Sequence, residues 1–106
     1  HVPLTDQTRH LINADRLARM KTGAVVINAA RGGVVDDAAL AEALHQGQIA
    51  GAALDVFETE PLTQDAAQVF AGIHNLVLTP HIAGVTKDSN VRVSAMIADH
   101  VLDRLA

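Results

Sequence analysis

The chain has 106 residues, of which 49% are hydrophobic and 19% charged, so it is apolar enough to bury a core, and disorder is excluded. Its 12 acidic and 8 basic residues include no Lys/Arg run, and aromatics make up only 2%, so we expect no nucleic-acid partner. Cysteine is absent, which excludes disulfides and thiolate sites, and no apolar run approaches the ~20 residues of a membrane span, so we expect no membrane partner.

The first predicted elements are a short helix and a buried strand. Asn13 is a good N-cap for a helix over 14–20, which Gly23 would end. The run over 24–28 is apolar and β-branched without alternation. Such a run is typical of a strand that is buried on both faces of a parallel sheet.

A second helix and a second strand follow. Asp36 and Asp37 offer an N-cap and a first-turn acid to a helix over 38–45. The run over 49–55 is again apolar, with small side chains. Strand, helix and strand in this order form a βαβ unit, whose two strands are parallel.

The last third of the chain predicts a loop, a third strand and a long helix. A polar loop over 58–65 and a short helix over 66–70 precede a strand over 76–78. Thr86 can cap a final helix over 87–105. Apolar side chains recur along one face of that helix, at Val91, Ala95, Ala98, Leu102 and Leu105. The order of elements predicts an α/β fold with a parallel sheet flanked by helices.

Candidate functional side chains follow the predicted strands. Arg31 comes after the first strand, Asp55 and Glu60 after the second, and His81 after the third. Ligands bind outside the carboxyl ends of the strands in an open parallel sheet. We therefore expect these four side chains along one rim.

Each residue type has a chemical use at such a rim. The planar fork of Arg31 suits a carboxylate or a carbonyl oxygen. His81 can exchange a proton near neutral pH, and Glu60 can fix its tautomer and stabilise its protonated form. Gly32 and Gly33 would let a ligand approach the backbone. Together these residues suit the reduction of a 2-oxo acid at its carbonyl.

Structural roles compete with each functional one. Arg31 can be a surface charge, Glu60 a solvated loop residue and Asp55 a turn residue. His81 can satisfy a loop carbonyl. No metal site is expected, because the histidines lack ligand spacing and N-capping explains the acid pair at 36–37 better than magnesium does.

Five runs of sequence resemble the D-isomer-specific 2-hydroxyacid dehydrogenase family. They are HVPLT (1–5), ARGG (30–33), ALDVF (53–57), EP (60–61) and TPHIAG (79–84). The resemblance covers essentially the whole chain and implies that residues 1–106 are the C-terminal portion of an NAD(P)-binding domain, part of a Rossmann-type doubly wound sheet. The family's G-x-G-x-x-G turn and its substrate-binding domain have no counterpart here, so we expect a fragment of a longer enzyme.

The resemblance also implies roles for individual residues. Arg31 resembles the arginine that holds the substrate carboxylate, His81 the acid/base and Glu60 its carboxylate partner. Asp55 resembles the aspartate that binds the nicotinamide carboxamide. The positions implied to line the cofactor are His1, Val2, Pro3, Ala29, Ala30, Arg31, Asp55, His81 and Gly84.

The function implied by the resemblance is hydride transfer between NAD(P)H, with NAD favoured over NADP, and C2 of a small D-2-hydroxy or 2-oxo acid. The enzyme would be a cytoplasmic homodimer in its full-length form. An alternative is the family's corepressor branch, in which the same fold senses NAD(H) and binds proteins. A third possibility is that the isolated 106-residue chain is inactive, because it lacks the phosphate-binding turn and exposes a sheet edge.

Overall fold

The computed structural model describes residues 1–106 and contains the predicted elements in the predicted order. In chain order they are α1 (Ala14–Ala18), β1 (Val25–Asn28), α2 (Asp37–His45), β2 (Gly51–Leu54), α3 (Gln64–Ala67), the 3-10 helix η1 (Gln68–Phe70), β3 (Leu76–Leu78) and α4 (Lys87–Leu105). None of the helices combines the length and the apolar character that crossing a membrane requires.

Side-chain caps determine where the helices begin. Asn13 accepts the N–H of Arg16 at the start of α1, and Asp36 accepts the N–H of Ala39 at the start of α2. Both caps agree with the sequence predictions. α1 ends at Ala18, earlier than predicted, because the next two N–H groups bond carbonyls three residues back and tighten the last turn.

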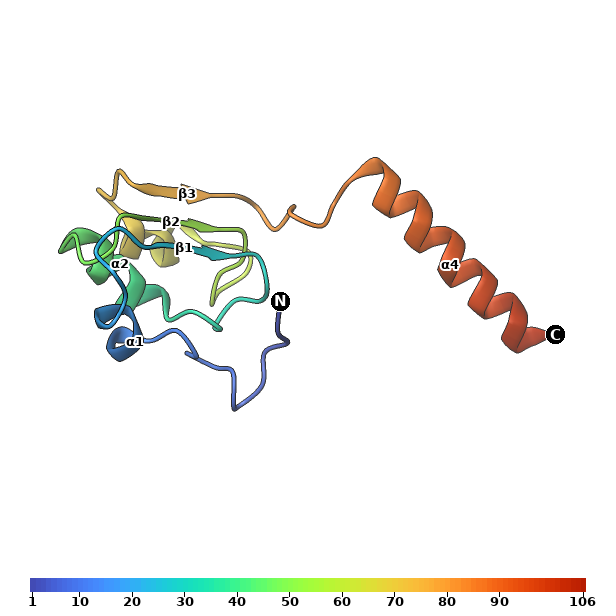
Figure 1. Cartoon of the computed structure of the whole chain (residues 1–106). Helices are drawn as coiled ribbons and strands as arrows, with labels where there is room; N and C mark the ends of the chain where they lie inside the picture. The colour runs from blue at the N-terminus through green and yellow to red at the C-terminus, as the bar shows by residue number, and fades with distance from the viewer.

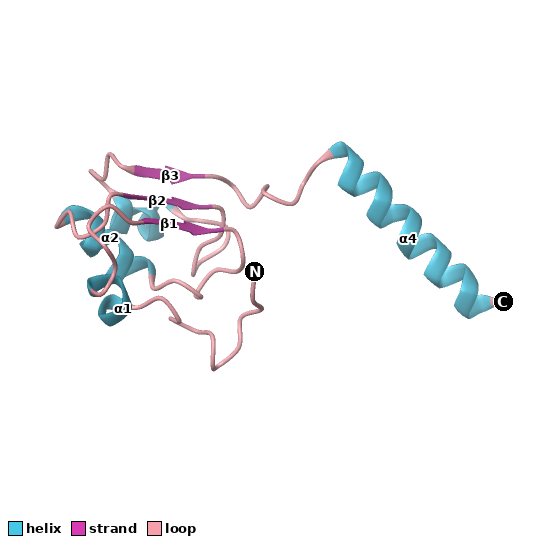
Figure 2. Cartoon of the chain, in the orientation of Figure 1, coloured by secondary structure: helices cyan, strands magenta, loops and turns pink.

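The three strands form one parallel sheet in the order β1, β2, β3 (Figure 1). Val26 pairs with Ala52, and Ala52 pairs with Leu76 on the other side. All three strands run in the same direction, so their carboxyl ends lie at one edge (Figure 2). The loops that follow the strands are therefore brought together there, as the sequence predicted.

The core lies between one face of the sheet and the helices. It includes Leu17 of α1, Leu40 of α2 and Leu54 of β2, each no more than 1% exposed. Phe57 and Phe70, the two aromatic residues of the chain, meet edge to face with ring centroids 6.2 Å apart. Small aliphatic side chains fill most of the rest, in keeping with the low aromatic content.

The opposite face of the sheet is open. Val25 and Ile27 of β1 are 61% and 73% exposed, and Val77 of β3 is 60% exposed. The prediction that the first strand is buried on both faces is therefore wrong. Its apolar run is continuous, but the helices of this chain cover only the face that carries Val26 and Asn28.

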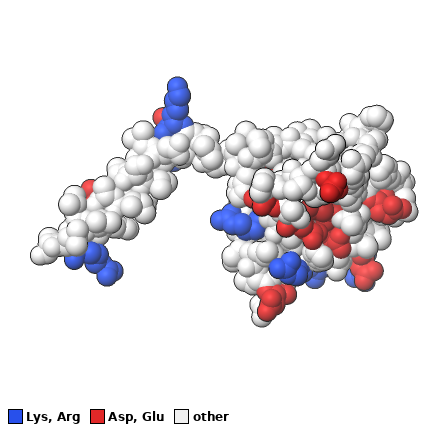
Figure 3. Space-filling model, turned by 180° about the vertical axis from the view of Figure 1, so that it is seen from behind, with Lys and Arg blue, Asp and Glu red and all other residues white.

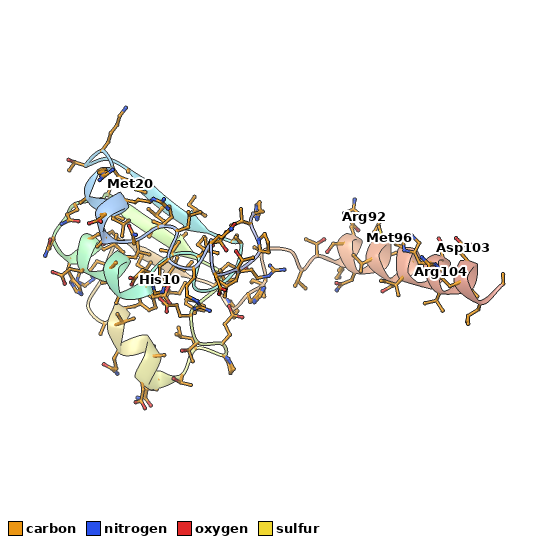
Figure 4. All side chains as sticks on the ribbon, turned by 90° about the horizontal axis from the view of Figure 1, so that it is seen from below. His10, Met20, Arg92, Met96, Asp103 and Arg104 are labelled. Carbon is orange, nitrogen blue, oxygen red and sulfur yellow. The ribbon has the colours of Figure 1, made fainter.

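α4 stands away from residues 1–78, here called the body, at the end of the connecting loop 79–86 (Figure 1). Every residue of α4 except Ser89 is exposed. Arg92, Met96, Asp103 and Arg104 project from it with no other element beside them (Figure 4). The chain consequently measures 58 × 27 × 26 Å, far longer than it is wide.

Candidate active site

Glu60 and His81 meet beyond the carboxyl ends of β2 and β3. Oε2 of Glu60 lies 2.8 Å from Nδ1 of His81. Oε1 of the same carboxylate accepts the N–H of Phe57 at 3.0 Å, which fixes the carboxylate in place. The pairing leaves Nε2 as the ring nitrogen of His81 that is available to a ligand. The structure thus brings together the two side chains that the sequence paired.

The charge of Glu60 follows from its hydrogen bonds. The bond from the Phe57 backbone, followed by the bond from His81, holds the pKa of Glu60 below its usual range. An ionised carboxylate accepts only, so Nδ1 of His81 must carry a proton in this pair. This hydrogen bond fixes the orientation of the imidazole and places a proton on its Nδ1.

Asp55 anchors the loop that carries His81. Its Oδ1 accepts the hydroxyl of Thr79 at 2.6 Å and the N–H of Ile82 at 2.9 Å, and its Oδ2 accepts the N–H of Ala83 at 2.9 Å. The Thr79 hydroxyl is the largest cause of a lowered pKa for Asp55, so the carboxylate stays ionised. The sequence placed Asp55 at this rim but did not reveal its hold on the loop.

Arg31 lies at the same edge of the sheet but apart from this group. It borders a hollow of about 190 Å³ that His1, Val2, Pro3 and Ala30 also line. Its guanidinium donates to the carbonyl of Ala30 at 2.6 Å and forms no ion pair with an acidic side chain. The positive charge of Arg31 is therefore free to bind an anionic ligand.

Asn28 shapes the turn that presents Arg31. The side chain is buried, its Oδ1 accepts the N–H of Ala30 at 3.1 Å, and its Nδ2 donates to the carbonyl of Arg31 at 3.1 Å. The amide thereby holds the backbone of Ala29 and Ala30 at the strand end. Sequence reasoning assigned Asn28 no role, although an amide at a strand end can both donate and accept in such a turn.

The two glycines after Arg31 are each required by the conformation of the chain itself. A β-carbon at Gly32 would lie 1.7 Å from the carbonyl oxygen of Phe57. Gly33 has φ +80°, in the left-handed region that glycine tolerates best. The protein's own backbone, not a ligand, occupies the space next to Gly32.

A larger hollow lies beside the Glu60–His81 pair. Its volume is about 640 Å³, and its lining is Phe57, Glu60, Pro61, Leu62, Leu78, Thr79, Pro80 and His81. Most of these side chains are apolar, so the Glu60–His81 pair lies at the border of an apolar space. Gly84 lies further along the loop, with open space around it and its carbonyl bonded to the Ser89 hydroxyl.

The chain is similar to dehydrogenases over nearly its whole length. Residues 1–83 match the family described as D-isomer specific 2-hydroxyacid dehydrogenase, NAD binding domain. The (S)-sulfolactate dehydrogenase of Chromohalobacter salexigens is 54% identical over 101 residues, which cover 95% of this chain and 32% of that protein. The hydroxypyruvate reductase of Thermotoga maritima is 41% identical over 105 residues, covering 99% of this chain and 34% of that protein.

Solved structures reproduce the fold. D-lactate dehydrogenase from Aquifex aeolicus, complexed with NAD and lactic acid, matches with a TM-score of 0.87 and 36% identity, covering 99% of this chain and 35% of that one. An NADPH-dependent glyoxylate/hydroxypyruvate reductase from Sinorhizobium meliloti, in complex with NADP and malonate, gives a TM-score of 0.86 and 38% identity, over 99% of this chain and 32% of that one. The chain spans about a third of the length of the curated relatives named above.

Proposed function

Because the chain belongs to the D-isomer specific 2-hydroxyacid dehydrogenase family, with a Rossmann-like α/β fold, we propose that it carries the proton-transfer and carboxylate-binding residues of an NAD(P)-dependent enzyme. The reaction is the interconversion of a small D-2-hydroxy acid and its 2-oxo acid. The single observation that carries this proposal is the hydrogen bond of 2.8 Å between Glu60 and His81 at the carboxyl edge of the sheet. The unpaired guanidinium of Arg31 on the same edge supplies the anion site.

The residues at this edge fit a bound dinucleotide, with Asp55 and the backbone of Ala29 and Ala30 toward its nicotinamide end and His1, Val2 and Pro3 toward its adenosine side. His1, Val2, Pro3 and Ala30 surround a hollow beside Arg31, and the backbone at Ala29 is held next to it by Asn28. Oδ2 of Asp55 accepts one N–H and has capacity left for a carboxamide donor, and Gly84 leaves open space in the same loop. When bound, a nicotinamide would supply or accept the hydride at C2 of the substrate. We favour NAD over NADP, as the family description names NAD.

The chain's own residues perform the proton transfer. In the reducing direction, the guanidinium of Arg31 holds the substrate carboxylate and orients the C2 carbonyl. His81, protonated on both ring nitrogens, donates its Nε2 proton to the C2 oxygen as the hydride reaches C2, which yields the hydroxyl. Glu60 stabilises the imidazolium through Nδ1–H, and in the oxidising direction His81 takes the proton back.

The chain is one part of this enzyme in our proposal. Residues 1–106 form the C-terminal portion of the NAD(P)-binding domain, and they span about a third of the relatives' length. The open sheet face and the exposed α4 support burial against further protein, which the remaining domain and the second subunit of a homodimer would supply. We place this enzyme in the cytoplasm.

Turnover of glyoxylate or hydroxypyruvate with NADH by the full-length protein tests the proposal. His81→Ala and Arg31→Ala should each lower turnover by orders of magnitude, since a general acid/base alone contributes ~10²–10⁴ in rate. The matched control is His45→Ala, at the exposed end of α2, which should leave turnover unchanged. Near-normal turnover by His81→Ala would remove the mechanism. NADH binding without turnover by the unmodified protein would favour the NAD(H)-sensing alternative.

A further inference from the structure

Thr79 forms no hydrogen bond to Glu60 or to the imidazole of His81, yet it begins the loop that carries His81 and is bonded to the end of β2. Its backbone N–H donates to the carbonyl of Leu54 at 3.0 Å, which extends the pairing of β2 and β3. Its hydroxyl donates to Oδ1 of Asp55 at 2.6 Å, the shortest of the three hydrogen bonds that reach this carboxylate. Thr79 thus joins the sheet to the loop.

One carboxylate holds the backbone on both sides of His81. Asp55 accepts the hydroxyl of Thr79 before the histidine, and the N–H groups of Ile82 and Ala83 after it. Between these points the N–H of His81 donates to the carbonyl of Thr79 at 3.1 Å, and His81 itself has φ +54°. A left-handed conformation at a non-glycine residue persists only where the surroundings hold it.

The imidazole therefore has two separate supports. Glu60 fixes the direction of the ring through Nδ1, and Asp55 fixes the backbone from which the ring extends. We propose that Thr79 is a positioning residue for the dehydrogenase reaction: its hydroxyl holds Asp55 in the orientation that keeps the His81 backbone, and so the reacting Nε2, in place. This inference rests on the proposed function, because it needs His81 to be the proton donor.

The hydroxyl also determines which oxygen of Asp55 remains open. Oδ1 accepts two donors, from Thr79 and Ile82, whereas Oδ2 accepts only the N–H of Ala83. A ligand donor therefore meets Oδ2. The hydrogen bond from Thr79 is also the largest cause of the lowered pKa of Asp55. Loss of this bond therefore raises the pH at which the Asp55 carboxylate becomes protonated.

The test compares Thr79→Val with Thr79→Ser in the full-length enzyme. Valine keeps the shape and removes the hydroxyl, so we expect kcat to fall about tenfold, the effect of losing one hydrogen bond to a charged group. KM for the 2-oxo acid should change less than twofold, because Arg31 lies on another loop. The acid limb of the pH–kcat profile should move to higher pH. Serine keeps the hydroxyl and should restore kcat to within about twofold.

A matched control separates positioning from stability. Thr63 also uses its hydroxyl structurally, as the N-cap of α3 outside the site. Thr63→Val should lower the melting temperature and leave both kcat and the acid limb unchanged. If Thr79→Val does not fold, Thr79→Ala removes the hydroxyl without placing a methyl group against the carboxylate, and it should show the same loss.

Two results would overturn the inference: kcat within twofold of the unmodified enzyme in Thr79→Val, or a loss in Thr79→Val that Thr79→Ser does not restore. His81→Ala distinguishes this failure from failure of the proposed function. If His81→Ala is inactive while Thr79→Val is fully active, only the role of Thr79 is lost. If His81→Ala is active, the proposed function fails as well.

Discussion

The body and α4 contain the same kinds of aliphatic side chain, but these side chains are buried in the body and exposed in α4. In the body, Leu40 is fully buried in a core cluster that also contains Leu17 of α1 and Leu54 of β2. In α4, Leu102 is 64% exposed, and the helix begins at a capping box between Thr86 and Ser89. A periodic apolar face therefore predicts where a helix forms. It does not predict which part of the chain that face will contact.

The two regions also differ in surface charge. On the face shown in Figure 3, acidic side chains gather on the body beside several basic ones, whereas α4 carries side chains of both signs separated by uncharged stretches. The match to the Aquifex aeolicus enzyme extends over 99% of this chain and so includes α4. About two thirds of that enzyme lies outside the match.

The largest difference between the regions should appear when a leucine is shortened in each. Leu40→Ala removes a 0% exposed side chain and should lower the free energy of unfolding by about 2–5 kcal/mol. Leu102→Ala makes the same change in α4 and should alter it by no more than about 0.5 kcal/mol. Urea unfolding of the 106-residue chain measures both. Equal losses would mean that α4 packs in solution, and light scattering would then show whether a second copy is its partner.

The next largest effect on stability is expected where the backbone of Gly32 passes close to the carbonyl of Phe57. Gly32→Ala places a β-carbon 1.7 Å from the carbonyl oxygen of Phe57, so the loops must part, and we expect a loss of about 3 kcal/mol. Gly23→Ala has no atom within 4 Å of the added carbon and should change stability by less than about 0.5 kcal/mol. The urea midpoints of the Gly32→Ala and Gly23→Ala variants test whether this close approach is rigid. Equal midpoints would show that the Phe57 loop yields freely.

The sequence predicted the local features of the fold well. The caps at Asn13, Asp36 and Thr86 lie where expected, because an N-cap depends on a side chain and a backbone N–H only two or three residues apart. The burial of β1 could not be predicted from the same evidence. Its continuous apolar run indicates that both faces of the strand are suited to burial. Whether a helix covers each face depends on elements far away in the chain.

A helix cap provides a smaller test on α4 alone. Thr86→Ala removes the hydroxyl that accepts the N–H of Ser89 and should destabilise the first turn of α4 by about 1 kcal/mol. Amide hydrogen exchange should quicken at Ser89 and Asn90, while exchange at Leu40 in the body stays the same. Thr22→Ala, at an exposed turn of the body, serves as the control. Faster exchange at Leu40 in Thr86→Ala would contradict the independence of the two regions.

The smallest expected effect is a response to acid in the loop between the regions. Hydrogen bonds lower the pKa of Asp55, chiefly from the Thr79 hydroxyl, and of Glu60, chiefly from the Phe57 backbone. A lowered pKa means that the folded state prefers the ionised form. The stabilisation is complete above the unfolded-state pKa values of about 4 and is lost as the pH falls through the lowered values.

Amide protection in this loop gives the readout. The protection factors of Ile82 and Ala83, whose N–H groups Asp55 accepts, should fall below about pH 4. The protection factor of Ser89 should stay the same, because its N–H is accepted by the hydroxyl of Thr86, which does not titrate. Asp55→Asn should lose protection at Ile82 and Ala83 at neutral pH also. Unchanged protection of Ile82 and Ala83 down to pH 2 would contradict the role of the Asp55 carboxylate in holding this loop.

The site was only partly predictable from the sequence. Residue types and strand order brought Glu60 and His81 to one edge, and their contact of 2.8 Å agrees with that prediction. The supports of Asn28, Thr79 and Asp55 were missed, because each works through backbone groups whose positions depend on how the loops turn. The roles of individual residues in catalysis stay predictions.

The left-handed backbone of His81 places a limit on how stable this site can be. A conformation with φ +54° costs a histidine on the order of 1 kcal/mol that a glycine would not lose. Part of the free energy from the Asp55 hydrogen bonds is therefore consumed in holding one side chain where its chemistry is needed. A glycine at this position would relieve that cost and remove the imidazole, so reactivity and stability are opposed at His81.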